Sequence, residues 1–295
     1  MPGDKGDKNS LLFELPEGKP PKHRGVKVFE KHIWSENKAQ LIENYLNLFT
    51  LVTHHGTYID GFAGPQEDSA GDSWTARVVL AASPRRLTRF FLYERDAKKY
   101  ERLHEMADNQ PRGKPGDATR RIRIRRGDCN ILIPSILRAN EVPKHSATFC
   151  FLDQHTFECH WKTVETIARH PKPKYKIEIL YFLGSGWMNR ALAALKNKSV
   201  RHKWWGDYEY PDKHPTPGQL CTLFRKRFED DLGYASAIAY PLRDKRAKTM
   251  VNLIHATDHP AAPDLMRRAY DHAGGPKPTQ GQYKLILKGL GLDLQ

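Results

Sequence analysis

Apolar and polar positions along the chain repeat in a strand-then-helix order. Five short apolar runs, each followed by a segment of helical periodicity, predict five β-α units. A helix over residues 37–52, with Ser35 as its N-cap, precedes the first strand. Because consecutive β-α units form a mainly parallel sheet with right-handed crossovers, the pattern predicts an α/β fold. The predicted strands span residues 57–60, 89–94, 121–125, 147–152 and 176–182, and the helices after them span residues 73–82, 96–108, 129–140, 161–170 and 187–198.

The last two predicted strands, residues 234–242 and 249–257, are joined by only about six residues. Predicted helices over residues 218–232 and 262–272 flank them. A connection this short cannot cross over between parallel strands, so the two strands must pair as an antiparallel hairpin. Five parallel strands followed by a C-terminal β-hairpin are typical of the seven-stranded Rossmann-like methyltransferase fold, with helices on both faces of the sheet.

Composition suggests how the chain divides. Residues 1–30 are rich in proline, glycine and lysine, which predicts a mobile basic arm. Residues 31–273 carry the β-α pattern and form the single predicted domain. Residues 200–217 within it look irregular, and residues 274–295 form a weakly patterned C-terminal tail.

Charge points to a polyanionic partner. The chain has 48 Lys and Arg against 34 Asp and Glu, a net charge of +14. Such an excess favours nucleic acid, because neutralising phosphates releases counterions. No apolar run approaches the length of a membrane span, the N-terminus does not resemble a secretory signal, and the 4 cysteines are too few for a disulfide scaffold. We therefore expect a cytoplasmic protein without a membrane partner.

The first predicted strand ends in an acid and leads into two glycines. Asp60 is followed by Gly61, Phe62 and, three residues after Gly61, by Gly64. In an open α/β sheet, ligands bind beyond the carboxyl ends of the strands, and glycine lets the backbone approach a ligand closely. These four residues are predicted to bind a cofactor. The full G-x-G-x-x-G pattern of dinucleotide sites is absent.

Acids also follow the next three strands. Glu94 is placed to bind ribose hydroxyls, Asp128 lies where an adenine amino group would bind, and Asp153 lies where the substrate would meet the reacting methyl group. Four acids suit a ribose, an adenine and a cationic sulfonium, and they suit a pyrophosphate poorly. The pattern therefore predicts S-adenosylmethionine (SAM) as cofactor. The alternative is that these acids are turn formers and helix caps without a ligand.

The chain resembles the three-Cys-motif partner protein (TcmP) family over roughly residues 27–270. The stretch YIDGFAGP, residues 58–65, is the most specific match. The resemblance implies a methyltransferase-like Rossmann fold and a partner protein with a cysteine motif. It does not specify a substrate. The other matching stretches are Trp34-Ser35 with Lys38 and Tyr45-Leu46, Phe151 to Asp153, Trp161 to Ile167, Met188 to Arg190, His255 to Thr257, and Leu265-Met266.

The sequence departs from the family after the fourth strand. The family usually has a D-P-[FY]-G-like turn there, similar to the catalytic motif of amino-methyltransferases, whose acid or amide and following carbonyl accept hydrogen bonds from the target amine. This chain reads Asp153-Gln154-His155-Thr156-Phe157, so the acid and an aromatic residue remain while the proline and glycine do not. Gln154 cannot fix φ as proline does. Either the substrate differs or the site is altered.

His155 is the second candidate catalytic residue. An imidazole titrates near neutral pH, so His155 could act as a general base beside Asp153. Cys159 and His160 follow closely, and thiolate with imidazole suits zinc. No further cysteine or histidine pair supplies the remaining ligands, so the sequence favours a polar pocket and predicts no metal site.

Two basic runs are candidates for nucleic-acid contact. Residues 112–126 contain seven Lys and Arg residues, and Lys203 is followed directly by Trp204 and Trp205. Cations beside aromatic rings provide the phosphate contacts and the stacking planes that single-stranded nucleic acid needs. Arg190 could hold a substrate phosphate. The alternative is a solvated basic face with two tryptophans in the core.

These observations favour a SAM-dependent methyltransferase that acts on nucleic acid or on a nucleotide-like substrate. A non-catalytic, nucleic-acid-binding or cofactor-sensing partner protein on the same fold is the main alternative, and the altered turn at Asp153-Gln154 supports it. A nucleotide-dependent enzyme such as a phosphohydrolase is disfavoured, because the sequence lacks G-x-x-x-x-G-K-[ST].

Overall fold

The computed structural model describes residues 37–66, 74–111, 113–115, 117–207, 210–211, 215–243 and 248–292. The chain divides into two units, Met1–Lys31 and His32–Gln295, and every described residue belongs to the second. The predicted basic arm, the predicted cap Ser35 and Arg112 lie outside the described residues.

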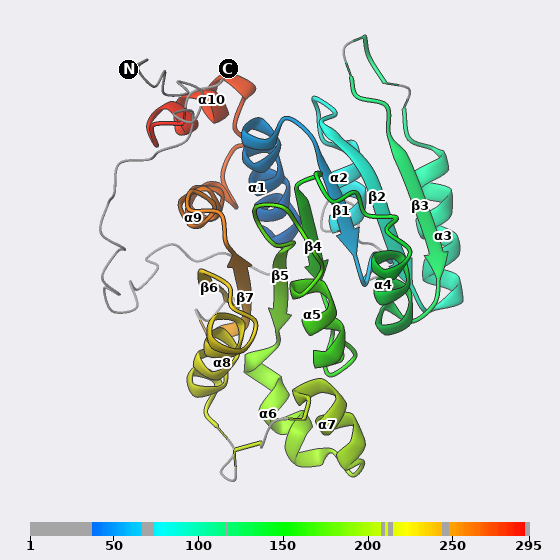
Figure 1. Ribbon diagram of the computed structural model, residues 1–295, viewed down its shortest axis with the longest axis vertical. Coiled ribbons are helices and arrows are strands. Elements are labelled where there is room, and N and C mark those ends of the chain that lie inside the picture. Colours follow the sequence, from blue (N-terminus) through cyan, green and yellow to red (C-terminus); the bar gives the residue numbers. More distant parts are fainter. Residues whose placement is uncertain are drawn as a thin grey trace, which may run out of the picture. The chain divides into compact units, whose positions relative to one another are not determined.

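A seven-stranded sheet in the order β3-β2-β1-β4-β5-β7-β6 forms the centre of the described unit (Figure 1). All pairs are parallel except β5 with β7 and β6 with β7. This order confirms the predicted fold class, including the C-terminal hairpin. The strands are β1 (Gly56–Asp60), β2 (Leu87–Glu94), β3 (Arg121–Arg126), β4 (Thr148–Leu152), β5 (Glu178–Leu183), β6 (Ser236–Arg243) and β7 (Thr249–Thr257).

Helices cover both faces of the sheet, as predicted. On one face, α1 packs its aromatic side chains on the strands, with ring centroids of Tyr45 and Phe149 5.4 Å apart. On the other face, α4, α5 and α8 share a buried core with alternate strand residues such as Ile59 and Cys150. The helices are α1 (Lys38–Thr53), α2 (Thr75–Ala81), α3 (Ala97–Asp108), α4 (Cys129–Arg138), α5 (Trp161–Ala168), α6 (Ser185–Ala194), α7 (Lys198–Trp205), α8 (Pro217–Lys226) with the π-helical η2 (Arg227–Asp231), α9 (Ala262–His272) and α10 (Gln280–Lys288).

The structure corrects the prediction that residues 200–217 are irregular throughout. They begin within α7, which Asn197 caps by accepting a hydrogen bond from the Ser199 amide at 2.9 Å. The helical pattern is hidden in the sequence, because the exposed His202 and Lys203 directly precede the buried Trp204 and Trp205.

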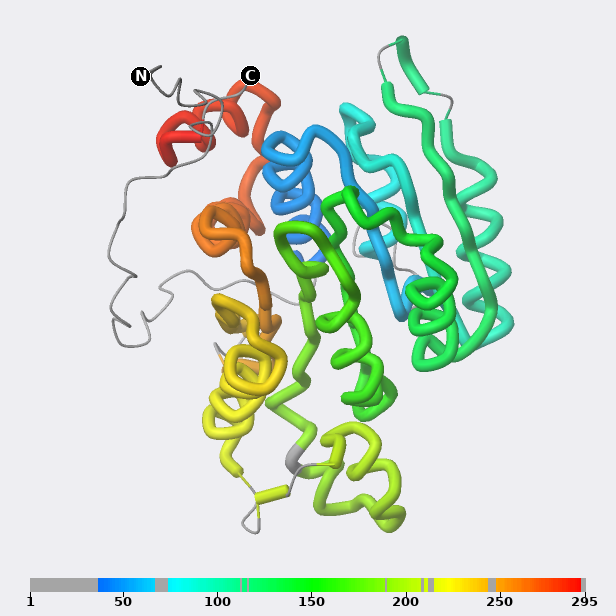
Figure 2. The backbone as a smooth tube through the Cα atoms, in the orientation of Figure 1, coloured from blue at the N-terminus to red at the C-terminus, as the bar shows by residue number. Residues whose placement is uncertain are grey.

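Part of the weakly patterned C-terminal segment is also ordered into a helix. The side chain of Thr279 caps α10, and Tyr283 donates a hydrogen bond to Asn44 of α1 at 2.7 Å. Figure 2 shows α1 in blue lying beside α9 and α10 in orange and red, so both ends of the described unit pack together.

Among the described residues, we find no helix with the length and hydrophobicity required to cross a lipid bilayer.

Candidate functional site at the carboxyl edge of the sheet

The strand order reverses between β1 and β4, since β2 and β3 lie on one side of β1 and the later strands lie on the other. Open α/β sheets bind ligands at the carboxyl ends of strands at such a switch point. Asp60 ends β1, and Asp153 directly follows the last residue of β4. The Gly61 amide donates to the Phe151 carbonyl at 3.1 Å and extends the pairing of the two strands. The fold thereby brings two of the predicted acids to its expected ligand site.

Asp60 is a buried carboxyl with partners for both oxygens. Its side chain accepts hydrogen bonds from the Tyr58 hydroxyl and from the Phe62 amide, each at 3.0 Å. Burial and, to a smaller extent, the negative charge of Asp153 together raise the pKa of Asp60 to about 7, while the hydrogen bond from the Phe62 amide opposes the shift. Asp60 therefore changes its charge near neutral pH.

Gly64 and Glu94 form a close contact that depends on glycine. The Gly64 amide donates to Glu94 Oε2 at 3.1 Å, and the Asp96 amide donates to Oε1 at 2.8 Å. A Cβ atom on Gly64 would lie 2.2 Å from Oε2, so any other residue would displace the carboxylate. The predicted cofactor loop after β1 is thus tied to the acid at the end of β2.

Gly61 has a different environment. A Cβ atom there would lie 3.2 Å from Leu152 and 3.4 Å from Cys129, both in the buried core. Its missing side chain therefore permits close packing beneath the loop, and a larger residue would disturb the core.

Asp128 caps a helix. Its Oδ1 accepts hydrogen bonds from the amide of Asn130 at 2.8 Å and from the Asn130 side chain at 2.7 Å, at the start of α4. The carboxylate of Asp128 is half-buried and has an observed role as the cap of α4. Its contact with an adenine stays a prediction.

Asp153 is buried and carries one oxygen without a partner. Lys38, the first residue of α1, forms an ion pair with Oδ2, and the Gln66 amide nitrogen donates to the same oxygen at 2.7 Å. The other oxygen, Oδ1, is buried and has no hydrogen-bond partner among the described residues. Since buried polar atoms are almost always paired, Oδ1 marks a position that a ligand can fill.

Sequence reasoning missed the role of Lys38. Its ammonium is buried, 5.2 Å from the ring centre of Phe182 and 5.9 Å from that of Phe151. Lys38 shares one small cavity with the predicted loop, and the cavity has room for about 10 Å³, close to one water molecule. The residues that line this cavity are Lys38, Asp60, Phe62, Ala63, Gly64, Gln66, Trp74, Thr75, Ala76, Phe151 and Asp153.

Gln154 explains how the altered turn is held. Its side chain is fully buried, donates to the Phe182 carbonyl at 3.1 Å and accepts from the Cys159 amide at 3.1 Å. These bonds join the turn after β4 to the end of β5 and fix it without the proline. The Gln154 side chain therefore has a structural role, since both ends of its amide are hydrogen-bonded within the protein.

His155 lies apart from the cavity. Its side chain is exposed, its ring centre is 6.0 Å from that of Trp187, and it is not among the residues that line the cavity around Asp153. A general-base role for His155 stays a prediction. No cluster of three or more possible metal ligands occurs within the described ranges.

The structure corrects the prediction that Trp204 and Trp205 offer stacking surfaces. Trp204 is 0% exposed and Trp205 is 4% exposed. Trp204 donates to the Tyr181 hydroxyl at 3.0 Å, and the guanidinium of Arg227 lies 4.6 Å from the Trp205 ring centre. Both indoles pack in the core, so neither presents a free face to a base.

The two basic residues predicted to contact substrate after β5 are accessible to solvent. Lys203 of α7 and Arg190 of α6 have exposed side chains. Both helices follow β5 and lie beyond its arrowhead, at the carboxyl edge of the sheet (Figure 1). The edge strand β3 also exposes Arg121 and Arg126, while Arg123 and Arg125 form ion pairs with Glu141. Because Arg121 begins β3 and Arg126 ends it, Arg126 is the exposed cation that β3 contributes at the carboxyl edge, while Arg190 and Lys203 lie on the β5 side.

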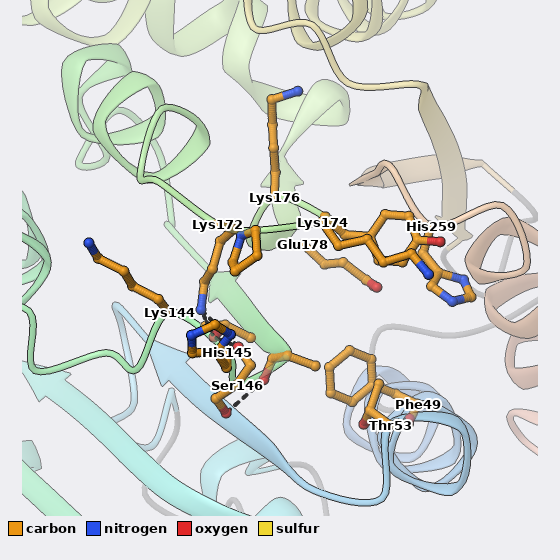
Figure 3. Close-up of a pocket in the computed structure, with 14 residues that line it drawn as sticks. Phe49, Thr53, Lys144, His145, Ser146, Lys172, Lys174, Lys176, Glu178 and His259 are labelled. Carbon is orange, nitrogen blue, oxygen red and sulfur yellow. Dashed lines mark hydrogen bonds between the residues drawn. The ribbon is translucent and has the colours of Figure 1, made fainter. Parts of the chain in front are cut away.

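A second, larger cavity lies at the opposite edge, where β4 and β5 begin (Figure 3). It has room for about 230 Å³, and Glu178 is the only acid among its lining residues. The Tyr45 hydroxyl and His255 Nε2, the latter at 3.0 Å, both contact Glu178 Oε2. The basic lining residues are Lys144, His145, Lys172, Lys174, Lys176 and His259.

Comparison with known proteins adds little at the level of sequence, since no family model and no curated protein matches the chain. Solved structures with a similar fold include Trm1 from Pyrococcus horikoshii in complex with SAM, at 13% identity and a TM-score of 0.40 over 80% of this chain. The chain spans only 58% of that protein.

Two further solved structures match this chain over most of their own length. A Legionella pneumophila protein has 9% identity and a TM-score of 0.43 over 82% of this chain and 94% of its own. A SAM-dependent methyltransferase from Methanosarcina mazei has 11% identity and a TM-score of 0.36 over 71% of this chain and 95% of its own. The strand order β3-β2-β1-β4-β5-β7-β6 observed in this chain is that of the seven-stranded methyltransferase-like fold.

Proposed function

We propose that this chain is a SAM-dependent methyltransferase that acts on nucleic acid or on a nucleotide-like substrate. The observation that carries the proposal is the buried group of Asp60, Asp153 and Lys38 at the switch point of the sheet. With all three ionised, the group has a net charge of −1. A ligand with one positive charge in this cavity would balance it, whereas a triphosphate would add charge of the wrong sign.

The residues present fit the parts of SAM. Glu94, held by the Gly64 amide at 3.1 Å, is placed to accept hydrogen bonds from ribose hydroxyls. Asp60 supplies negative charge near a sulfonium, since Lys38 is paired with Asp153. Asp128 would accept a hydrogen bond from the adenine amino group. When bound, SAM supplies an electrophilic methyl group for in-line transfer to a nucleophile.

The chain's own residues would orient the acceptor. Asp153 Oδ1, buried and unpaired among the described residues, can accept a hydrogen bond from an acceptor N–H group. That bond holds the nitrogen and increases its electron density, and the surrounding buried side chains exclude water. Gln66, whose exposed side chain bridges to Asp153, must move for a ligand to enter. Exposed cations such as Lys203 and Arg190 would contact substrate phosphates.

We further propose membership of the TcmP family, because the residues of YIDGFAGP build the loop that carries Asp60 and Gly64 in the candidate site. A cysteine-motif partner protein and a cytoplasmic location belong to the same proposal. The second candidate function is a non-catalytic, cofactor-sensing nucleic-acid-binding protein. The burial of Gln154 favours it, since this side chain cannot reach a substrate.

Methyl transfer from isotope-labelled SAM to total RNA, to total DNA and to nucleotides tests the proposal. We expect label in a nucleic-acid or nucleotide fraction, and none with an Asp153→Ala variant that still binds SAM. SAM binding without transfer to any acceptor would favour the non-catalytic alternative. Binding of ATP in place of SAM would refute both.

A further inference from the structure

Lys38 places a positive charge directly on the candidate catalytic acid. It starts α1, 115 residues away from Asp153 in sequence, and the two side chains form an ion pair in which each is 6% exposed. Because water hardly reaches the pair, the charge of Lys38 is weakly screened. Any group that binds beside Asp153 must therefore also tolerate a nearby ammonium.

The two carboxylate oxygens of Asp153 differ in their hydrogen-bond partners. Oδ2 is occupied by Lys38 and by Gln66, the latter at 2.7 Å. Oδ1 is buried and has no partner among the described residues. An unpaired buried acceptor is costly, so this oxygen favours a ligand that donates a hydrogen bond. Since both oxygens belong to one carboxylate, that ligand group would lie within a few ångströms of the Lys38 ammonium.

The charge of a suitable ligand group follows from this arrangement. Lys38 neutralises Asp153, so once a proton or a bound sulfonium balances Asp60, a second cation at Oδ1 would gain little attraction and would meet repulsion from Lys38. An uncharged N–H donor gains the hydrogen bond without that repulsion. The rings of Phe151 and Phe182 both lie near the Lys38 ammonium, and Phe151 also lines the cavity beside Asp153.

We propose that Lys38 restricts the acceptor subsite at Asp153 to an uncharged N–H group, such as the exocyclic amino group of a nucleobase, and excludes aliphatic ammonium groups. This inference rests on the proposed function and refines its substrate class. Lys38 is a specificity-determining residue that acts through Asp153. Without it, Asp153 would be an uncompensated buried carboxylate that attracts cations.

The test measures binding by calorimetry at pH 6, where Asp60 is largely protonated, with four probes: adenosine, cytidine, guanosine and n-butylammonium. The wild-type protein is expected to bind at least one nucleoside at least tenfold more tightly than n-butylammonium. Lys38→Met is expected to reverse this preference, and Lys38→Arg, which keeps the charge, is expected to retain it. Lys162→Met is the matched control, because the Lys162 side chain is 79% exposed on α5 and its loss should leave every affinity unchanged.

Thermal unfolding of each variant separates selectivity from folding. Should Lys38→Met not fold, the double variant Lys38→Met with Asp153→Asn removes both charges together. That variant is expected to lose n-butylammonium binding and to keep measurable nucleoside binding. A purely structural role for Lys38 would weaken all probes alike, and that result would overturn the inference.

Two further results would overturn it: n-butylammonium binding to the wild-type protein as tightly as the nucleosides, and no binding of any probe. SAM affinity is measured on the same samples. Loss of the expected selectivity with intact SAM binding refutes only this inference. The expected selectivity without SAM binding refutes only the proposed cofactor.

Discussion

The two edges of the same sheet differ in how their charged groups are used. At the amino edge, Glu178 is held by Tyr45 and His255 inside the protein, and its cavity is large and basic. At the carboxyl edge, Asp153 keeps an unpaired buried oxygen in a cavity that is nearly filled. The two edges therefore differ in the size of their cavities and in whether both oxygens of the buried carboxylate are available: Asp153 Oδ1 has no partner among the described residues.

Lys172 illustrates how the amino edge satisfies its own groups. Its ammonium donates to the carbonyls of Pro143 and Ser146 and to the Thr148 hydroxyl, at 2.8, 2.8 and 3.0 Å. These contacts use all three of its N–H groups, and burial lowers the pKa of Lys172 to about 8. Lys172 therefore holds the loops that border the cavity and has no donor left for a ligand.

The largest expected effect on cofactor binding comes from Gly64→Ala. The new Cβ atom would displace the Glu94 carboxylate, so SAM affinity should fall by roughly a hundredfold. Calorimetry measures the change. Gly218→Ala is the control, because a Cβ atom there meets nothing within 4 Å. Equal SAM affinity in the two variants would show that the loop carrying Gly64 does not contribute to SAM binding.

Glu94→Ala tests the same contact from the other side. Loss of a charge-assisted hydrogen bond to ribose should cost about 1.5–3 kcal/mol, or about tenfold to a hundredfold in SAM affinity. The loss is measured by calorimetry at constant salt. A loss below about threefold would show that another acid, such as Asp96, binds the ribose.

The carboxyl edge should respond to pH through Asp60. Burial raises the pKa of this carboxyl to about 7, so below that pH it carries a proton and no longer attracts a sulfonium. SAM affinity should fall by about fivefold from pH 7 to pH 6 beyond any general loss, because the ionised fraction of Asp60 falls by that factor. Asp60→Asn should bind weakly and without this pH dependence, and an unchanged pH profile in that variant would contradict the assignment.

The same carboxyl predicts a stability trend. Its pKa lies above the unfolded value of 3.8, so between pH 4 and pH 7 the unfolded state releases the proton that the folded state keeps. The Asp60 contribution to stability is therefore present at low pH and is lost as pH rises through 7. Asp60→Asn should remove this slope, which urea unfolding at several pH values can measure.

A smaller effect is expected from Lys203→Ala on nucleic-acid binding. If the exposed ammonium contacts one phosphate, the slope of log K against log salt should become less negative by about 0.7 to 0.9, and all sequences should weaken alike. Titrations with labelled RNA and DNA at several salt concentrations give the slope. Absence of any binding at low salt would reject the nucleic-acid partner.

The smallest effect is expected at the amino edge. Lys144→Ala removes an exposed cation from the larger cavity and should change SAM affinity by less than about twofold. A tenfold loss of SAM affinity in this variant would indicate that SAM binds at the amino edge instead of the carboxyl edge.

The sequence predicted the strands and the acids at their ends well, because apolar runs and short connections are local signals. The hairpin of β6 and β7 could be predicted from its six-residue connection alone. The sequence analysis missed α7, in which two buried tryptophans follow basic residues. For the same reason it favoured stacking surfaces for Trp204 and Trp205 over the alternative that both lie in the core. It could not assign Lys38 or Gln154, because their partners Asp153 and Phe182 come together only through long-range folding.

A crystal structure of the protein in the presence of SAM tests most directly whether the cofactor binds at the carboxyl edge of the sheet. The account predicts SAM at the carboxyl edge, with its ribose on Glu94 and its sulfonium near Asp60 and Asp153. SAM bound in the basic cavity around Lys144 and Glu178, or at neither edge at saturating concentration, would contradict it.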